Sequence, residues 1–279
     1  MRDRFRFART GTGRVGAGLL VFAVAVALLG PFVAPHAPDE PIGAPYERPS
    51  SEAVLGTDRL GRDVLSRVLW GGRSVLALAG LATLFAYVAG VGIGLLAGYS
   101  RSWVDPLLMR TADVFIAFPA LVFLLVLVTG LGTSKGVLVL GVAIIQTPPV
   151  ARIVRSATLA QSVRGFVEAA VARGEGTLAI LRRELLPNVV SPIAADVGIR
   201  FTLAIILVAS VNFLGLGLQP PAADWALMIS ENRDGLTLNP YAVLAPALMI
   251  AVLTIAANMI GDAIARTQST SVAVARAGA

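Results

Sequence analysis

Six long apolar blocks constrain the fold of this sequence more than any other feature. They cover approximately residues 15–34, 75–98, 114–131, 137–150, 189–214 and 241–265. A helix needs about 20 mostly apolar residues to cross the hydrocarbon core of a bilayer. The blocks therefore predict an all-α, polytopic membrane protein with six transmembrane helices.

The composition agrees with a membrane protein. Of 279 residues, 56% are hydrophobic and 14% are charged, whereas a soluble domain carries about 25% charged residues. This balance argues against a disordered chain and against an ordinary soluble enzyme. The chain has no cysteine and a single histidine, His36. We therefore expect no disulfide, no thiolate nucleophile and no multi-histidine metal site.

Basic residues predict the orientation in the membrane. With the N-terminus inside, the inner segments hold 15 basic residues and the outer segments hold 7. Cytoplasmic loops carry an excess of Lys and Arg, so both termini are expected in the cytoplasm. This topology also explains the pI of about 10.6, and no nucleic-acid partner is expected. A cleaved signal peptide is the alternative interpretation of the first block.

The inner connection, residues 151–188, is long, since most connections in compact proteins have about 4–6 residues. An alanine-rich helical stretch in it ends at Gly174, and a second short helical run ends at Pro187. Glycine commonly terminates helices. The pattern predicts a helix–turn–helix presented to the cytosol, with small residues, Ala169 and Ala170, where a partner packs closely. An amphipathic helix at the membrane surface is the alternative.

An outer segment combines glycine with closely spaced opposite charges. Its motif residues are Gly56, Thr57, Asp58, Gly61, Arg62 and Asp63. Because one arginine stands between the two acids, we expect a structural, salt-bridged turn that leads into a helix. A site in which Asp58, Arg62 and Asp63 bind a metal or a peptide terminus is the alternative.

Polar residues inside the apolar blocks are candidates for the translocation path. Asp196 and Arg200 stand four residues apart, in the order that favours pairing on a helix. Charged groups within a span are functional candidates by default, but a structural pair is the favoured interpretation. Asn212 and Asn258 are expected to bond between helices or to contact substrate. The second block contains Gly90, Gly92, Gly94 and Gly98, which predict tight helix packing.

The inner connection resembles a known family motif. Its Glu168-Ala169-Ala170, Gly174 and Leu186-Pro187 resemble the EAA loop of binding-protein-dependent ABC importer permeases. The outer motif, residues 56–63, resembles the GTDxxGRD signature of permeases for dipeptides, oligopeptides and nickel. The resemblance covers about residues 10–267 and is closest to the second of the two permeases in such systems.

The resemblance implies a type I ABC permease fold in a bacterial cytoplasmic membrane. It assigns ATPase coupling to six residues of the inner connection: Glu168, Ala169, Ala170, Gly174, Leu186 and Pro187. The implied partners are a second permease subunit, two ATPase subunits or domains, an extracytoplasmic substrate-binding protein and the lipid bilayer. No cofactor is expected on this chain, which lacks a G-x-x-x-x-G-K-[ST] loop. ATP and Mg²⁺ are expected on the ATPase subunits, and the chain itself is not expected to be an enzyme.

The same resemblance divides the chain into three parts. Residues 1–74 are an N-terminal segment with the first transmembrane helix and the outer motif. Residues 75–265 are the permease core with the inner connection, and residues 266–279 are a cytoplasmic tail. The implied function is the import of short peptides. The alternatives are a nickel or other small-solute permease of the same family, an ion-coupled secondary transporter, and a structural membrane scaffold.

Overall fold

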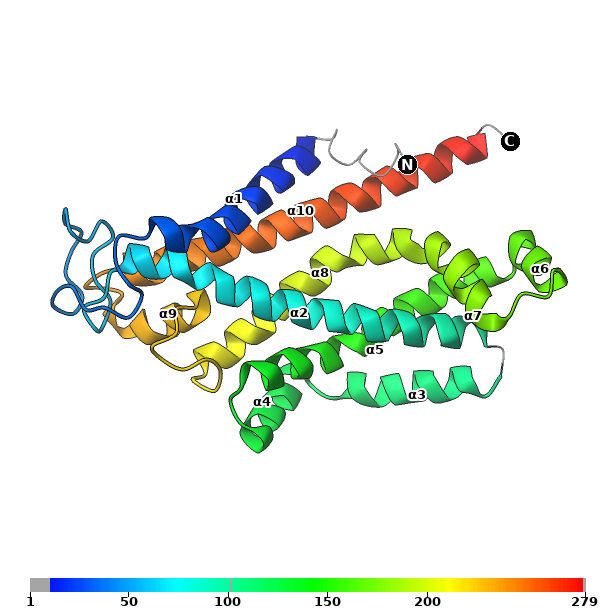
Figure 1. The fold of residues 1–279 in the computed structure, drawn as a ribbon, viewed down its shortest axis with the longest axis horizontal. Helices are drawn as coiled ribbons and strands as arrows, with labels where there is room; N and C mark the ends of the chain where they lie inside the picture. Colours follow the sequence, from blue (N-terminus) through cyan, green and yellow to red (C-terminus); the bar gives the residue numbers. More distant parts are fainter. Residues whose placement is uncertain (1–10, 101, 278–279) are drawn as a thin grey trace.

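Long apolar helices lie side by side along the molecule (Figure 1). The structure is a computed structural model that describes residues 11–100 and 102–277. Five of the described helices are long and apolar enough to cross a membrane, and a bent pair makes a sixth if it is one span. These helices are α1 (Gly11–Val33), α2 (Val64–Tyr99), the pair α3 (Val104–Ala117) and α4 (Ala120–Leu131), α5 (Lys135–Ser162), α8 (Leu186–Phe213) and α10 (Tyr241–Ala277).

Short elements occupy the two ends of the molecule. Near one end lie α6 (Gly165–Ala172), α7 (Thr177–Ala179) and a π-helix, η2 (Ile180–Leu185). At the other end lie α9 (Trp225–Asn232), the 3₁₀-helix η3 (Arg233–Gly235) and the loop that joins α1 to α2 (Figure 1). Among the described residues the only β-pairing is two isolated bridges within that loop. The predicted all-α membrane fold is confirmed, with five apolar spans among the described residues, or six if the bent pair is one span.

The third apolar block is not one continuous helix. Its chain bends by 85° between α3 and α4, at Phe118 and Pro119, and Phe118 adopts an extended backbone. Proline disfavours the helical conformation of the residue before it, so the single span predicted over residues 114–131 was wrong in this respect.

The fourth block behaves in the opposite way. Instead of ending at residue 150, α5 continues through Pro148 and Pro149 to Ser162. Prolines are tolerated in transmembrane helices whose neighbours support them, and α5 packs along α2. The first third of the predicted inner connection is therefore a continuation of the span. Similarly, Pro187 does not end a helical run, because it lies in the first turn of α8, which continues directly from the π-helix η2.

Close packing between α2 and α5 forms the centre of the bundle. A β-carbon on Gly90 would lie 2.7 Å from Val150, and one on Gly94 would lie 2.6 Å from the Ala151 carbonyl oxygen. Gly98 meets Thr158 in the same way, whereas Gly92 faces open space. Three of the four glycines thus form the predicted packing face. At these positions α5 lies so close to α2 that a β-carbon would clash with it.

This contact predicts a selective loss of stability in one glycine variant. Gly94→Ala places a methyl group against the α5 backbone and is expected to cost about 1–3 kcal/mol of unfolding free energy. Gly92→Ala, which meets no atom within 4 Å, is the matched control. Thermal unfolding of the two variants in detergent measures the difference, and equal melting temperatures would contradict the packing.

Candidate functional site

A buried ionic network joins the outer motif to α9. The Oδ2 atom of Asp58 accepts hydrogen bonds from Nε of Arg62 at 2.7 Å and from Nη1 of Arg67 at 3.1 Å. Both guanidinium groups also donate to Oε2 of Glu231, each at 3.0 Å. The four side chains are between 0% and 4% exposed. Two carboxylates and two guanidinium groups therefore neutralise each other within one enclosed cluster.

The network is the salt-bridged turn expected from the sequence, with two more members. Arg67 and Glu231 were not among the predicted site residues. Glu231 lies 169 residues beyond Arg62, and no local pattern connects them. Burial raises the pKa of the Glu231 carboxyl above its ordinary value, against the opposing effect of Arg62 and Arg59. Among the described residues, no group of three or more His, Asp or Glu side chains is placed to hold a metal ion.

Asp63 has a different function from Asp58. Its carboxylate accepts from the Ser66 backbone N–H at 3.0 Å and from the Ser66 hydroxyl at 2.5 Å. Asp63 is therefore the N-cap of α2, a position at which a carboxylate satisfies free backbone donors. Gly56 and Gly61 have φ values of +72° and +75°, which residues with a side chain rarely adopt. The motif thus folds the chain tightly and starts α2.

The loops that the sequence predicts to lie outside the membrane pack into one unit, here called the outer cap (residues 35–63 and 215–240). The indole N–H of the buried Trp225 donates to the Val68 carbonyl of α2 at 2.8 Å. Asn239 donates to the carbonyls of Leu55 and Thr57. These bonds hold α9 and the α1–α2 loop against the start of α2.

The ionic network predicts a large and specific stability effect. Glu231→Gln removes one charge and leaves two buried guanidinium groups opposite Asp58 alone. Breaking a buried ion pair costs about 3–5 kcal/mol, so this variant is expected to unfold at much lower temperature. The exposed Glu52 provides the control, because Glu52→Gln is expected to change stability by less than about 0.5 kcal/mol. Comparable melting curves for the two variants would argue against the network.

The predicted helix–turn at the inner end is present. Helix α6 ends at a turn in which Gly174 has a φ of +78°. The Glu175 N–H donates to the Ala170 carbonyl and the Gly174 N–H to the Val171 carbonyl, as in common glycine-terminated helix ends. Glycine suits this position because the left-handed conformation is strained for most other residues.

The coupling residues predicted from the sequence do not all face the same way. Glu168 and Ala169 are exposed, whereas Ala170 is fully buried against the chain itself. The expectation that Ala170 offers a surface for a partner was therefore wrong. Leu186 is half-buried and Pro187 is exposed, in the first turn of α8. The outward surface near the turn also includes Val171 and Leu178, which are 54% and 77% exposed.

Ala170 belongs to an apolar group, here called the inner cluster, that joins α6 to three spans. Helix α6 contributes Val167 and Ala170. The remaining buried members come from α2, α5, η2 and α8: Tyr87, Leu95, Val150, Val154, Ile180, Leu181, Leu185 and Val189. The helix–turn therefore shares a buried apolar cluster with the spans, in addition to its covalent connections to them.

The four polar residues predicted within the spans occupy three separate places. Nε of Arg200 donates to Oδ2 of Asp196 at 2.9 Å, which confirms the pair. Asn212 is fully buried, and its amide bonds to Asp224 and to the Leu218 N–H.

Asn258 donates to the Thr202 hydroxyl and so links α10 to α8. The bonds of both asparagines favour structural positions over substrate contact.

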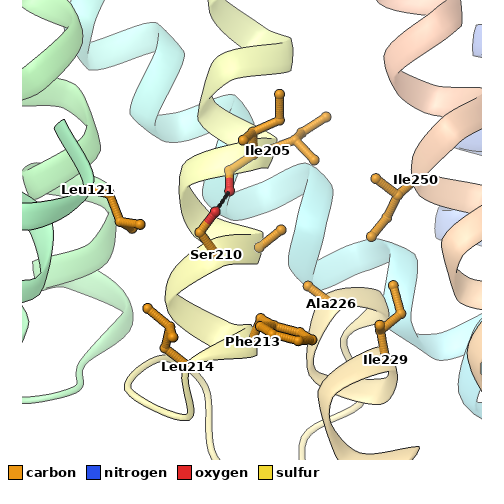
Figure 2. A pocket seen from close by; sticks show the side chains of 10 residues that line it. Leu121, Ile205, Ser210, Phe213, Leu214, Ala226, Ile229 and Ile250 are labelled. Atoms are coloured by element: carbon orange, nitrogen blue, oxygen red, sulfur yellow. Dashed lines mark hydrogen bonds between the residues drawn. The ribbon is translucent and has the colours of Figure 1, made fainter. Parts of the chain in front are cut away.

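An open apolar hollow of about 430 Å³ lies between α4, α8, α9 and α10 (Figure 2). Its walls are aliphatic and aromatic apart from Ser210, whose hydroxyl donates to the Ile206 carbonyl. The lining residues are Leu121, Ile205, Ile206, Ala209, Ser210, Phe213, Leu214, Ala226, Ile229 and Ile250. The sequence did not reveal this site, because its residues are ordinary members of apolar spans.

Known proteins match this chain over most of its length. Residues 90–270 match the family described as binding-protein-dependent transport system inner membrane component. The glutathione transport system permease protein GsiD of Pectobacterium atrosepticum is 37% identical over 253 residues, which are 89% of this chain and 83% of the relative. The di/tripeptide transport system permease protein DppC of Pseudomonas aeruginosa is 34% identical over 263 residues, which are 92% and 87% of the two chains.

A solved structure has the same fold. The MetNI methionine ABC transporter in an inward-facing conformation matches with a TM-score of 0.58 and 19% identity, over 73% of this chain and 95% of that chain. The chain therefore belongs to the family of binding-protein-dependent transport system inner membrane components, and it is a multi-pass inner-membrane permease subunit of an ABC importer.

Proposed function

We propose that this chain carries short peptides across the bacterial cytoplasmic membrane, together with a second permease subunit. The observation that carries the proposal is the extended similarity to permeases named for glutathione and for di- and tripeptides. The arrangement of the helices supports it, because the outer cap and α6 lie at opposite ends of the same long spans (Figure 1).

The ATPase partner docks at α6 in this proposal. The exposed surface there combines Glu168 and Ala169 with the apolar side chains of Val171 and Leu178. Exposed apolar side chains grouped beside polar ones are typical of a protein–protein contact. The partner chains bind ATP and Mg²⁺ and hydrolyse the ATP. Their movement changes the conformation of this chain, which is not phosphorylated.

The substrate-binding protein docks on the outer cap. Four apolar side chains of the cap are exposed, between 45% and 59%: Val54, Leu60, Leu236 and Leu238. The buried ionic network beneath them keeps this surface in a fixed shape. The second permease subunit closes the open side of the apolar hollow, which is the part of the translocation route that this chain supplies.

Reconstitution of the complete transporter tests the substrate. The chain is placed in proteoliposomes with a second permease subunit, ATPase subunits and a substrate-binding protein, and ATP is supplied on the side that corresponds to the cytoplasm. Uptake is measured for a radiolabelled dipeptide, a tripeptide, glutathione and Ni²⁺. We expect ATP-dependent uptake of one of the peptides. Uptake of Ni²⁺ alone, or uptake by this chain alone driven by an ion gradient, would contradict the proposal.

The turn after α6 predicts a transport defect without a folding defect. Gly174→Asp adds a charge and a side chain at a φ of +78°, in the surface that meets the ATPase. We expect ATP-driven uptake to be abolished while membrane insertion is unchanged.

Gly174→Asn is the matched variant, because asparagine has the same shape as aspartate but carries no charge. Asparagine also tolerates the left-handed conformation better than most residues. It is expected to retain part of the uptake. Normal uptake by Gly174→Asp would show that the turn is not a docking surface.

A further inference from the structure

Tyr87 forms a link between two spans at a charged pair. The Tyr87 hydroxyl of α2 donates to Oδ2 of Asp196 in α8 at 2.8 Å, and Nε of Arg200 donates to the same oxygen at 2.9 Å. The three residues are 9%, 11% and 15% exposed in that order. We call them the Tyr87–Asp196–Arg200 triad. Asp196 and Arg200 neutralise each other on one helix, so the Tyr87 hydroxyl is an additional bond that reaches across to α2.

The ring of Tyr87 is packed into the inner cluster with α6. Val167 and Ala170 of α6 belong to that cluster, as do Leu181 and Leu185 of η2. Tyr87 therefore belongs to the apolar cluster that extends through η2 to α6, and its hydroxyl bonds to α8. None of the three triad residues lines the apolar hollow, and the polar atoms named here point at one another. This geometry favours a link between helices over contact with substrate.

The segment between α6 and α8 is irregular. Residues Ile180–Leu185 form a π-helix directly before α8, and π-helical turns occur often at functional sites because they permit a local change of helical register. A change of register in this segment when α6 moves would shift α8 relative to α2, against which it packs. The Tyr87 bond opposes this, because separation of the helices would remove one donor from a largely buried carboxylate, and such losses are costly.

We propose that Tyr87 is a positioning residue that makes α2 and α8 move together when the ATPases move α6. The proposal rests on the proposed function, since it assigns α6 to ATPase docking. It identifies a residue outside the EAA loop through which ATP hydrolysis is coupled to the spans. Two discrete arrangements of the packed helices, in which the triad stays closed, are the expected states.

Tyr87→Phe tests the link because it keeps the ring in the inner cluster and removes only the hydroxyl. The complete transporter is reconstituted, and substrate uptake and ATP hydrolysis are measured in the same vesicles. We expect the ATP consumed per substrate molecule to rise about fivefold or more, the usual size of a coupling effect between two sites. The control is Tyr241→Phe, the same change at the start of α10, in a residue outside the triad and outside the inner cluster. We expect this control to consume as much ATP per substrate molecule as the wild type.

The outcomes separate this inference from the proposed function. Wild-type uptake and ATPase binding test the proposed function. The change in ATP consumed per substrate molecule in Tyr87→Phe tests only the bond that Tyr87 makes between α2 and α8. An unchanged ATP-to-substrate ratio in Tyr87→Phe, or an equal rise of that ratio in Tyr241→Phe, would overturn the role of Tyr87.

A measurement on the otherwise wild-type chain covers the case in which Tyr87→Phe does not assemble. Spin labels are placed at two exposed positions on the linked helices, Leu84 of α2 and Val197 of α8. Their distance is measured in the nucleotide-free and vanadate-trapped transporter. We expect the same distance in both states. A distance that changes between the states would show that the helices move separately and would overturn the proposal.

Discussion

Gly90, Gly94 and Gly98 of α2 let the backbone of α5 approach to the limit of van der Waals contact, and the other parts of the structure depend on this contact. Packing of this kind stabilises helices in a bilayer, where burial of apolar surface gives little advantage because lipid is also apolar. The first turns of α2 carry the outer cap through Arg67 and Val68. The inner halves of both helices carry α6 through the inner cluster. A rigid pair of helices therefore connects the two ends of the permease.

Two enclosed groups of charged side chains occur among the described residues, one near the outer cap and one within the spans. The ionic network between the outer cap and α2 contains two carboxylates and two guanidinium groups, and the spans contain Asp196, Arg200 and the Tyr87 hydroxyl. Buried ions cost free energy unless they are paired and hydrogen-bonded. Closed groups are therefore expected where charges serve to fix geometry. Here the outer group fixes α9 on α2, and the inner group fixes α8 on α2.

Proline shows how far the sequence predicts local structure. The sequence places Pro119, Pro148, Pro149 and Pro187 within or beside apolar blocks, and their effects differ. Pro119 breaks a span, Pro148 and Pro149 lie inside a continuous helix, and Pro187 begins one. Each proline removes the same backbone donor. The local sequence does not show which proline interrupts its helix, and α5, which continues through two prolines, packs along α2.

The sequence by itself determined the apolar blocks and the two long connections between them, the one that carries the outer motif and the one over residues 151–188. It also determined the family motifs in these connections, because block length and glycine placement are local properties. It also predicted the pairing of Asp196 with Arg200, since four residues make one helical turn. Only the tertiary structure decided the partners of these groups. Glu231 completes the outer network from 169 residues away, Ala170 faces inward, and Tyr87 reaches Asp196 across 109 residues. Such contacts depend on which helix faces lie together, and that is fixed when the whole bundle packs.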